Sequence, residues 1–196
     1  MTAFQGGDDT AFEQLYNRYT RPIYQYIYRR MGSQARSEEL TQEVFLGLIR
    51  SRGSWRMEAS FKTYLYRIAF NQCASEARRA DFKVSDPLER PDGSTIDVVA
   101  DGPGPENNAS RREEAVLVAN ALEALDADQK EAILLREYQG LSYDEIAEVT
   151  GVAIGTVKSR IFRGKLELKR LLGPILGAGS DDSDGGKVVE LRSPTA

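Results

Sequence analysis

Glycine breaks within residues 124–172 constrain the fold of this chain more than any other feature. Ser142 and Glu145 have the S-x-x-E spacing of a capping box, which predicts that a helix begins just after Ser142. Gly151 is expected to end this helix, because glycine enters the left-handed conformation without a steric penalty. After a short turn, a longer helix is predicted from Ile154. Two helices joined in this way are typical of a helix-turn-helix, whose second helix enters the DNA major groove.

The longer helix is predicted to have an apolar face and a basic face. Between Lys158 and Arg170 there are six basic residues and one acidic residue, whereas residues 126–148 hold seven acidic and two basic residues. A solvated basic face on an ordinary amphipathic helix is the alternative interpretation. The capping box, the glycine breaks and the charge reversal together favour DNA binding. The apolar face has one small notch, at the glycine, and consists of Val157, Ile161, Gly164, Leu168 and Leu171.

The composition excludes several kinds of chemistry. The 196-residue chain has no histidine, which removes Ser-His-Asp catalysis, Cys-His catalysis and histidine-ligated metal sites. Its one cysteine, Cys73, cannot form an internal disulfide and is expected to be a small, partly buried side chain, although a redox role stays open. With no signal-peptide pattern and no membrane-spanning run, we expect a cytoplasmic protein without membrane insertion.

The first 80 residues read as several amphipathic helices. The N-cap candidates Asp8–Thr10 begin the first, Pro22 is expected to start or kink a second, and Ser37 to cap a third. In the third helix an apolar side should pack inward (Leu40, Val44 and Leu48), and an acidic and amide side with one leucine lies opposite (Glu39, Gln42, Glu43, Leu46 and Arg50). By itself this second side supports a partner-binding surface only weakly.

A polar loop and a further helix follow. The loop spans residues 52–59 with Trp55, and the helix begins near Ser60. Its polar stripe contains Arg67, Asn71 and Arg78 with Tyr64 and Ser75 beside it. Aromatic rings beside cations suit single-stranded nucleic acid, where bases stack and phosphates meet positive charge. Core aromatics beside a solvated arginine stripe fit the pattern equally well.

The chain is predicted to be all-α, with two small helical domains on a flexible tether. Helical periodicity fails in residues 81–110, where prolines, glycines and seven acidic residues against two basic ones indicate an extended linker. The domains are placed at 1–80 and 111–173, and residues 174–196 are expected to form a disordered tail. The net charge of −4 does not oppose nucleic-acid binding, because local fields govern attraction to phosphates.

Five motifs occur in a recognisable order: DDTAFEQLYNRY, EELTQEVFLGL, SFKTYLYRIAFN with Arg78-Arg79 behind it, LREYQGLSYDEIAEVTG and GTVKSRIFRGK. Together they resemble the extracytoplasmic-function (ECF) sigma factors of bacterial RNA polymerase, in their two-domain minimal form. The resemblance covers roughly residues 8–80 and 112–172. It implies a protein that binds core polymerase, brings it to promoter DNA and helps to open the duplex, without catalytic residues, metal or cofactor.

The resemblance also assigns surfaces. Core-polymerase binding, on the clamp helices of the largest subunit, maps to Glu39, Gln42, Glu43, Phe45, Leu46 and Ile49. The flap of the second-largest subunit is a further expected contact, to which no residues are assigned. Recognition of the −10 element, with one base flipped from the stack, maps to Trp55, Arg56, Ser60, Phe61, Tyr64, Arg67, Asn71, Arg78 and Arg79. Recognition of the −35 element maps to Thr156, Lys158, Ser159, Arg160, Phe162 and Arg163. An anti-sigma factor is an expected partner.

The chain departs from the family pattern at several positions. Ala153 and Asp126 replace prolines, which removes rigidity around the helix-turn-helix. Met57 replaces a glycine in the loop before the −10 helix, which leaves the base identity at the flipped position open, and Ser75 replaces an aspartate. The pair Gly164-Lys165 replaces Ala-Arg, which leaves contacts beyond the preceding arginine open.

Three other functions remain compatible with parts of the sequence. A helix-turn-helix regulator that never binds polymerase would leave the acidic helix face and the −10-like helix without a role. A serine recombinase would need an α/β catalytic domain, and no strand pattern is visible. A helical adaptor that binds only protein would not need the basic helix.

Overall fold

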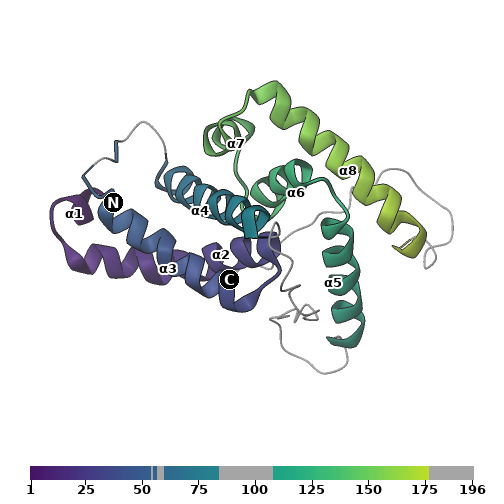
Figure 1. The fold of residues 1–196 in the computed structure, drawn as a ribbon, viewed down its shortest axis with the longest axis horizontal. Coiled ribbons are helices and arrows are strands. Elements are labelled where there is room, and N and C mark those ends of the chain that lie inside the picture. Colours follow the sequence, from purple (N-terminus) through teal and green to yellow (C-terminus); the bar gives the residue numbers. More distant parts are fainter. Residues whose placement is uncertain (54, 57–59, 84–107, 177–196) are drawn as a thin grey trace. The chain divides into compact units, whose positions relative to one another are not determined.

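The computed structural model describes residues 1–53, 55–56, 60–83 and 108–176. These residues contain helices and no strand, which confirms the expected all-α class (Figure 1). They form two compact units, of which the first contains α1–α4 and α7 and the second contains α5, α6, the π-helix η1 and α8. The helices span α1 Thr2–Gln5, α2 Asp9–Met31, α3 Gln34–Arg50, α4 Phe61–Lys83, α5 Asn108–Glu123, α6 Ala127–Ile133, η1 Leu134–Tyr138, α7 Tyr143–Thr150 and α8 Ile154–Leu176.

Helix α2 is one continuous helix. Asp8 caps it, as expected: its Oδ1 accepts hydrogen bonds from Thr10 N at 2.9 Å and Ala11 N at 3.2 Å. Of the two alternatives for Pro22, the start of a second helix is wrong, because Pro22 lies inside α2. An internal proline costs about 3 kcal/mol, but Ile23 and Ile27 just after it are fully buried, and each contributes about 1.5–3 kcal/mol. Core burial therefore outweighs the proline.

Helix α3 begins one turn earlier than predicted. Ser33, rather than Ser37, is its N-cap, and Ser33 Oγ accepts a hydrogen bond from Arg36 N at 3.4 Å. Ser37 is buried inside the helix, where its hydroxyl donates to the Ser33 carbonyl at 2.6 Å. A serine in the first turn of a helix can satisfy its hydroxyl on a preceding carbonyl, so a serine ahead of the apolar pattern did not by itself identify the cap.

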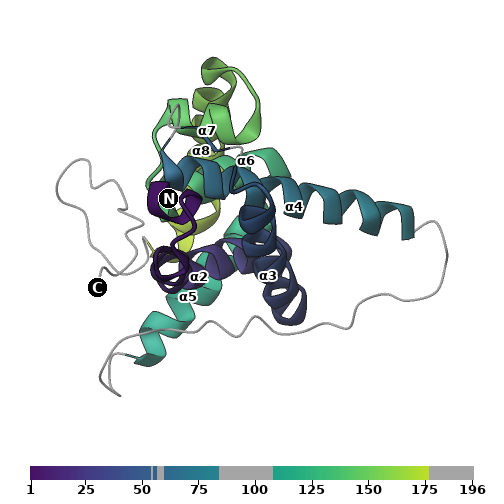
Figure 2. The same ribbon diagram turned by 90° about the vertical axis from the view of Figure 1, so that its left-hand side faces the viewer.

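The core of the first unit lies where α2, α3 and α4 meet (Figure 2). Leu40, Val44 and Leu48 of α3 are 1% exposed or less, which confirms their predicted inward face. On α4, Cys73 is fully buried, and Tyr66 packs edge-on against Tyr26 with ring centroids 5.4 Å apart. Burial raises the pKa of Tyr66 above its ordinary value. The inner sides of α3 and α4 thus belong to one packed core, and the exposed sides of these two helices carry the surfaces described below.

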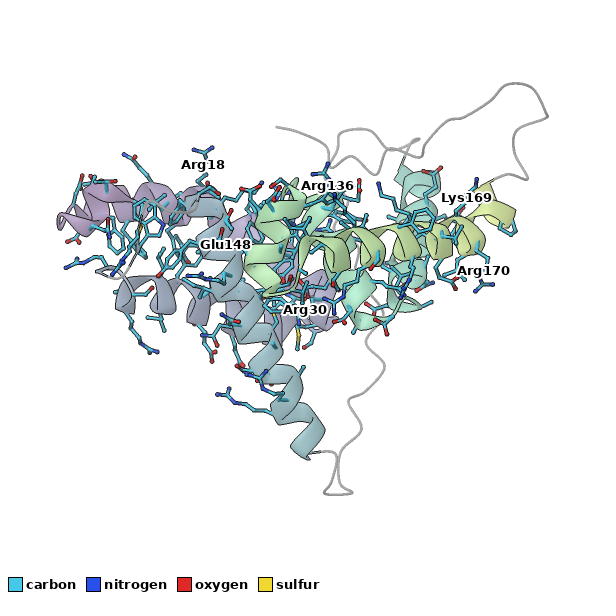
Figure 3. All side chains as sticks on the ribbon, turned by 90° about the horizontal axis from the view of Figure 1, so that it is seen from above. Arg18, Arg30, Arg136, Glu148, Lys169 and Arg170 are labelled. Atoms are coloured by element: carbon cyan, nitrogen blue, oxygen red, sulfur yellow. The ribbon has the colours of Figure 1, made fainter. Side chains whose placement is uncertain are left out.

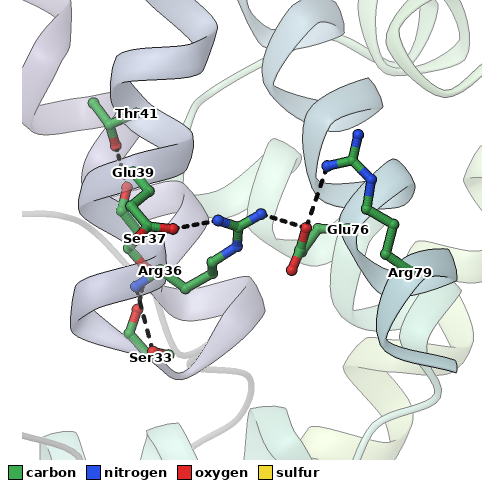
Figure 4. A network of polar contacts seen from close by, with 7 residues as sticks. All are labelled: Ser33, Arg36, Ser37, Glu39, Thr41, Glu76 and Arg79. Carbon is green, nitrogen blue, oxygen red and sulfur yellow. Dashed lines mark hydrogen bonds and ion pairs between the residues drawn. The ribbon is translucent and has the colours of Figure 1, made fainter. Parts of the chain in front are cut away.

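An ion-pair network also joins α3 to α4 (Figure 4). The Arg36 guanidinium bonds Glu39 on its own helix and Glu76 on α4. Arg79 lies one turn beyond Glu76, with 3.7 Å between its Nη1 and the Glu76 carboxylate. Because Arg36 and Glu76 are 29% and 19% exposed, this pair is screened less than a fully exposed one.

The second unit places the basic helix α8 on α6. Asp126 is the N-cap of α6 and its carboxylate accepts from Asp128 N at 3.0 Å, so the residue that replaces the family's proline supplies a cap. α6 continues directly into the π-helix η1, which the sequence did not predict. Gly164 confirms the predicted notch: a Cβ there would meet Ile133 Cγ1 at 3.0 Å.

The predicted domain limits coincide only roughly with the helix ends. α4 continues to Lys83 and α5 begins at Asn108, so helix enters both ends of the predicted linker. The rest of that linker, residues 84–107, and residues 177–196 of the predicted tail lie outside the described residues. Within the described parts of the chain, every helix is too short or too polar to cross a membrane.

Candidate polymerase and nucleic-acid interfaces

The predicted motif before α8 is present. Ser142 Oγ accepts from Glu145 N at 3.2 Å, and the Glu145 carboxylate accepts from Ser142 N at 2.9 Å, which completes the capping box. Gly151 ends α7 with φ of +71°, in the left-handed region expected for it. The capping box thus defines the start of α7, and Gly151 defines its end. α8 begins at Ile154, as predicted.

One side of α8 is buried and the other presents a mixed basic and apolar surface. Val157, Ile161 and Leu168 are 1–5% exposed, whereas Phe162 is 69% exposed. Lys158 and Arg163 are exposed on the Phe162 side, without an ion pair among the described residues. We call the group Lys158, Phe162, Arg163 and Leu166 the α8 outer face.

Leu166, 60% exposed, belongs to this face but was not predicted. It follows Phe162 by four residues and so lies one turn further along the same side. The spacing could have revealed it. Figure 3 shows two further basic side chains, Lys169 and Arg170, projecting from the C-terminal part of α8.

Not every residue predicted for the −35 element is available on this face. Arg160 forms an ion pair with Asp128 of α6, and its side chain is 24% exposed. Lys165, which was not among the predicted −35 residues, is also paired: its Nζ lies 2.8 Å from Glu137 Oε1. Ser159 Oγ donates to the Thr156 carbonyl at 2.9 Å, which occupies the hydroxyl locally. The structure thus groups Lys158 with Phe162 and Arg163, and it turns Arg160 toward α6.

The predicted polymerase-binding side of α3 is only partly exposed. Leu46 and Ile49 are 47% and 44% exposed, with Glu39 and Gln42 exposed and Glu43 half-buried along the same side. We call these five residues the α3 outer face.

Phe45 does not belong to this face and is corrected to a core residue. It is 3% exposed, and its ring lies 4.7 Å from that of Tyr16 and 6.4 Å from that of Phe12 between centroids. The reason is its position on the helix, which points it toward α2 rather than outward.

The predicted −10 residues separate into exposed polar side chains and covered aromatic ones. The polar members are exposed: Arg56, Ser60, Arg67, Asn71, Arg78 and Arg79. Tyr64 is 8% exposed beneath Arg67, whose guanidinium lies 5.6 Å from the ring centroid. Phe61 packs edge-on against Tyr19 at 5.2 Å. Tyr64 is therefore a core residue in this conformation, and half-buried Trp55 and Phe61 are the predicted aromatics that remain partly exposed.

Two hydroxyl groups at the start of α4 bind the carboxylate of Glu145 in α7. Glu145 Oε1 accepts hydrogen bonds from Thr63 Oγ1 at 2.8 Å and Ser60 Oγ at 3.1 Å, and Arg67 lies 3.9 Å from Glu148. The Ser142 backbone N–H, with these hydroxyls, lowers the pKa of Glu145 below its ordinary value. Hydroxyls and a cation that bind a carboxylate also suit a phosphate. Thr63 was missed by the sequence, because a buried threonine on a helix resembles core.

Metal ligation finds no support in the described part of the chain. No group of three or more Cys, Asp and Glu side chains lies close enough there to hold a metal ion.

Comparison with known proteins places both halves of the chain in one family. Sigma-70 region 2 matches residues 15–82, and sigma-70 region 4 matches residues 115–168. The ECF RNA polymerase sigma factor SigM of Mycobacterium tuberculosis is 33% identical across 88% of this chain and 83% of its own length. This chain belongs to the ECF RNA polymerase sigma factors. The sigma-H factor of Pseudomonas aeruginosa is 34% identical (88% and 91% covered), and the ECF sigma-E factor of Escherichia coli K12 is 32% identical (88% and 92%).

Solved structures agree with this membership. The sigma factor RpoE of Bartonella quintana, in its complex with the anti-sigma factor NepR, matches with a TM-score of 0.68 at 29% identity, over 83% of this chain and 97% of that one. CnrH, in complex with the cytosolic domain of CnrY, matches with a TM-score of 0.62 at 23% identity over 90% and 94%, which supports the fold alone.

The surfaces of this sigma factor fall inside the matched regions. The α3 outer face and the exposed cations of α4 lie in region 2, and the α8 outer face lies in region 4. Helix α1 precedes both matches.

Proposed function

We propose that this sigma factor binds core RNA polymerase through the α3 outer face, the −10 element through α4 and the segment before it, and the −35 element through the α8 outer face. Its work is recognition and strand opening, with no bond chemistry of its own. The observation that carries the proposal is Phe162, 69% exposed between Lys158 and Arg163 on a helix whose other side is buried. A large exposed aromatic between two cations marks a surface made for a ligand.

The α3 outer face has the make-up of a protein interface. Leu46 and Ile49 form an apolar centre, and Glu39, Gln42 and Glu43 surround it with polar groups. Such a face, with a small apolar centre and a polar rim, suits a partner that carries apolar and basic groups. The clamp helices of the largest polymerase subunit are the partner that the family relationship suggests.

The cations of α4 suit the melted −10 strand. Arg67, Arg78 and Arg79 are exposed along the helix with Asn71 between them. Cations in a row attract phosphates, and the side-chain amide can hydrogen-bond a base edge.

The α8 outer face suits the major groove of the −35 element. Arginine and lysine recognise the O6 and N7 acceptors of guanine, and an apolar side chain contacts the thymine methyl group. We assign the polar contacts to Lys158 and Arg163 and the apolar contact to Phe162. Arg160 is assigned a supporting role, because Asp128 holds it.

An anti-sigma factor is proposed as the regulatory partner. The RpoE of Bartonella quintana, with which this chain shares 29% identity and its fold, is seen with the anti-sigma factor NepR. The exposed Leu46 and Ile49 are apolar groups that such a protein could cover in competition with polymerase.

The experiment separates the two surfaces with matched variants. Core polymerase lacking its own sigma subunit is mixed with the wild-type chain, Leu46→Ser/Ile49→Ser, Phe162→Ala/Arg163→Ala, or the control Val116→Ser, which alters another exposed apolar residue. We expect the α3 variant to lose core binding at least tenfold. The α8 variant should keep core binding and lose promoter binding. Wild-type chain that fails to bind core, or an α3 variant that binds as the wild type does, would contradict the proposal.

A further inference from the structure

The short N-terminal helix α1 is anchored by one aromatic side chain. A four-residue helix does not form by itself in water, so tertiary contacts must hold it. Phe4 supplies them: it is 3% exposed, and its ring lies 5.1 Å from that of Phe12 in α2. α1 precedes the part of the chain that matches region 2, and the roles proposed above do not use it.

The next residue, Gln5, reaches the segment between α3 and α4. Its Nε2 donates to the carbonyl of Arg52 at 2.9 Å and to the carbonyl of Trp55 at 2.9 Å. A side-chain amide has two hydrogens, so both are used on these carbonyls. The Arg52 guanidinium in turn lies 5.6 Å from the centroid of the Phe4 ring. α1 therefore contacts this segment through two side chains.

The held segment is the one that leads to the proposed −10 surface. Trp55 and Arg56 belong to it, and both are among the residues assigned to the −10 element. The Trp55 indole Nε1 is buried and makes no hydrogen bond with any described residue. The indole N–H thus does not hold Trp55 in place, whereas the hydrogen bond from Gln5 holds its carbonyl.

We propose that Gln5 is a positioning residue for −10 recognition. By holding the carbonyls of Arg52 and Trp55, it sets where Trp55 and Arg56 meet the −10 strand, and so it controls base selectivity without touching DNA. This inference rests on the proposed function of that segment and extends it to a residue outside the family match.

A single substitution tests the inference, and the chain supplies its own probe. Gln5→Met keeps the length and removes both donors, and Gln5→Glu puts a carboxylate against two carbonyls. The chain has one tryptophan, so its fluorescence reports Trp55 alone. Gln14→Met, at an exposed position on α2, is the matched control. Loss of the two hydrogen bonds should lower the ratio of bound to released Arg52 and Trp55 carbonyls roughly tenfold.

We expect Gln5→Met and Gln5→Glu to shift Trp55 emission to longer wavelength and to raise its quenching by acrylamide. In open-complex assays on templates with single-base changes in the −10 element, the ratio between preferred and disfavoured bases should fall about three- to tenfold. Core binding and −35 affinity should stay at the wild-type level. Gln14→Met should match the wild type in every assay.

Two outcomes would overturn the inference. One is a Gln5→Met protein with unchanged −10 selectivity; the other is a loss of open complexes that is equal on all templates, which indicates a purely structural role. Failure of the wild-type chain itself to discriminate −10 bases would instead reject the proposed function. Thermal unfolding of each variant shows whether the fold is retained, and Phe4→Leu, a milder change at the same anchor, provides a second test of the selectivity ratio.

Discussion

Arg36 of α3 and Glu76 of α4 form an ion pair between two helices that carry different proposed surfaces (Figure 4). The Glu76 carboxylate raises the pKa of Arg36 above its ordinary value, so the charge on the guanidinium is secure. Glu39, on the α3 outer face, bonds the same guanidinium, and Arg79, assigned to the −10 strand, lies 3.7 Å from Glu76. The Arg36–Glu76 pair thus joins α3 to α4, and each of its members also contacts a residue of one proposed surface.

We expect the Arg36–Glu76 pair to contribute measurably to stability. A double-mutant cycle with Arg36→Met and Glu76→Gln, followed by urea unfolding, should give a coupling free energy of about 1 kcal/mol. The control cycle uses the pair Arg170–Glu167, whose arginine is 68% exposed, and should show no coupling. Equal coupling in the two cycles would mean that the interhelical pair is no stronger than a surface pair.

Glu145 should make stability depend on acid pH. Its carboxylate accepts hydrogen bonds in the folded protein, chiefly from the Ser142 N–H, so its pKa is lower folded than unfolded. The resulting stability is fully present above the unfolded pKa, about 4.5, and is lost as pH falls through the lower folded pKa. Urea unfolding should show a smaller decline in that range for Glu145→Gln, whose amide can still complete the capping box. Asp144→Asn, an exposed neighbour, should decline as the wild type does.

Two glycines near the helix-turn-helix should respond to alanine in opposite directions. Gly151 has φ of +71°, where a side chain costs about 1–2 kcal/mol, so Gly151→Ala should lower the free energy of unfolding by that amount. Gly155 lies in the first turn of α8 with no atom within 4 Å of an added Cβ. Gly155→Ala should leave stability unchanged or raise it by up to about 1 kcal/mol. A Gly151→Ala protein as stable as the wild type would contradict the role of Gly151 as the helix stop.

The α8 outer face should determine −35 affinity. Arg163→Ala should lose about 1–3 kcal/mol of binding to a −35 duplex if Arg163 meets a base edge, with the loss concentrated at one base pair. Phe162→Ala should lose affinity for the thymine duplex, and it should no longer distinguish thymine from uracil at the position whose methyl group the wild-type chain contacts. Fluorescence anisotropy at fixed salt measures both, and Arg170→Ala, altering an arginine bonded to Glu167, should bind as the wild type does. Unchanged affinity in Arg163→Ala would remove this residue from the interface.

Local signals in the sequence predicted the helix-turn-helix well. The Ser142–Glu145 box, the stop at Gly151, the start at Ile154 and the notch at Gly164 are all present, because each depends on residues close in the chain or on one helix face. The apolar side of α3 was predicted for the same reason.

Tertiary contacts explain what the sequence did not show. Pro22 lies inside α2, where the burial of the residues after it offsets the cost of the proline. Phe45 lies in the core, where its ring packs against Tyr16 of α2. Arg160 is held by Asp128, 32 residues away, and Gln5 bonds carbonyls 47 and 50 residues away. No periodicity or spacing encodes pairs of this kind.

The most direct test of the central claim is runoff transcription by core polymerase supplied with this chain. Templates are chosen from the promoters that polymerase occupies when the chain is overproduced. We expect promoter-specific transcripts with the wild-type chain, and their loss with Leu46→Ser/Ile49→Ser and with Phe162→Ala/Arg163→Ala. The control Val116→Ser should transcribe normally. Absence of promoter-specific transcripts with the wild-type chain, or full activity in both double variants, would contradict the assignment of these surfaces.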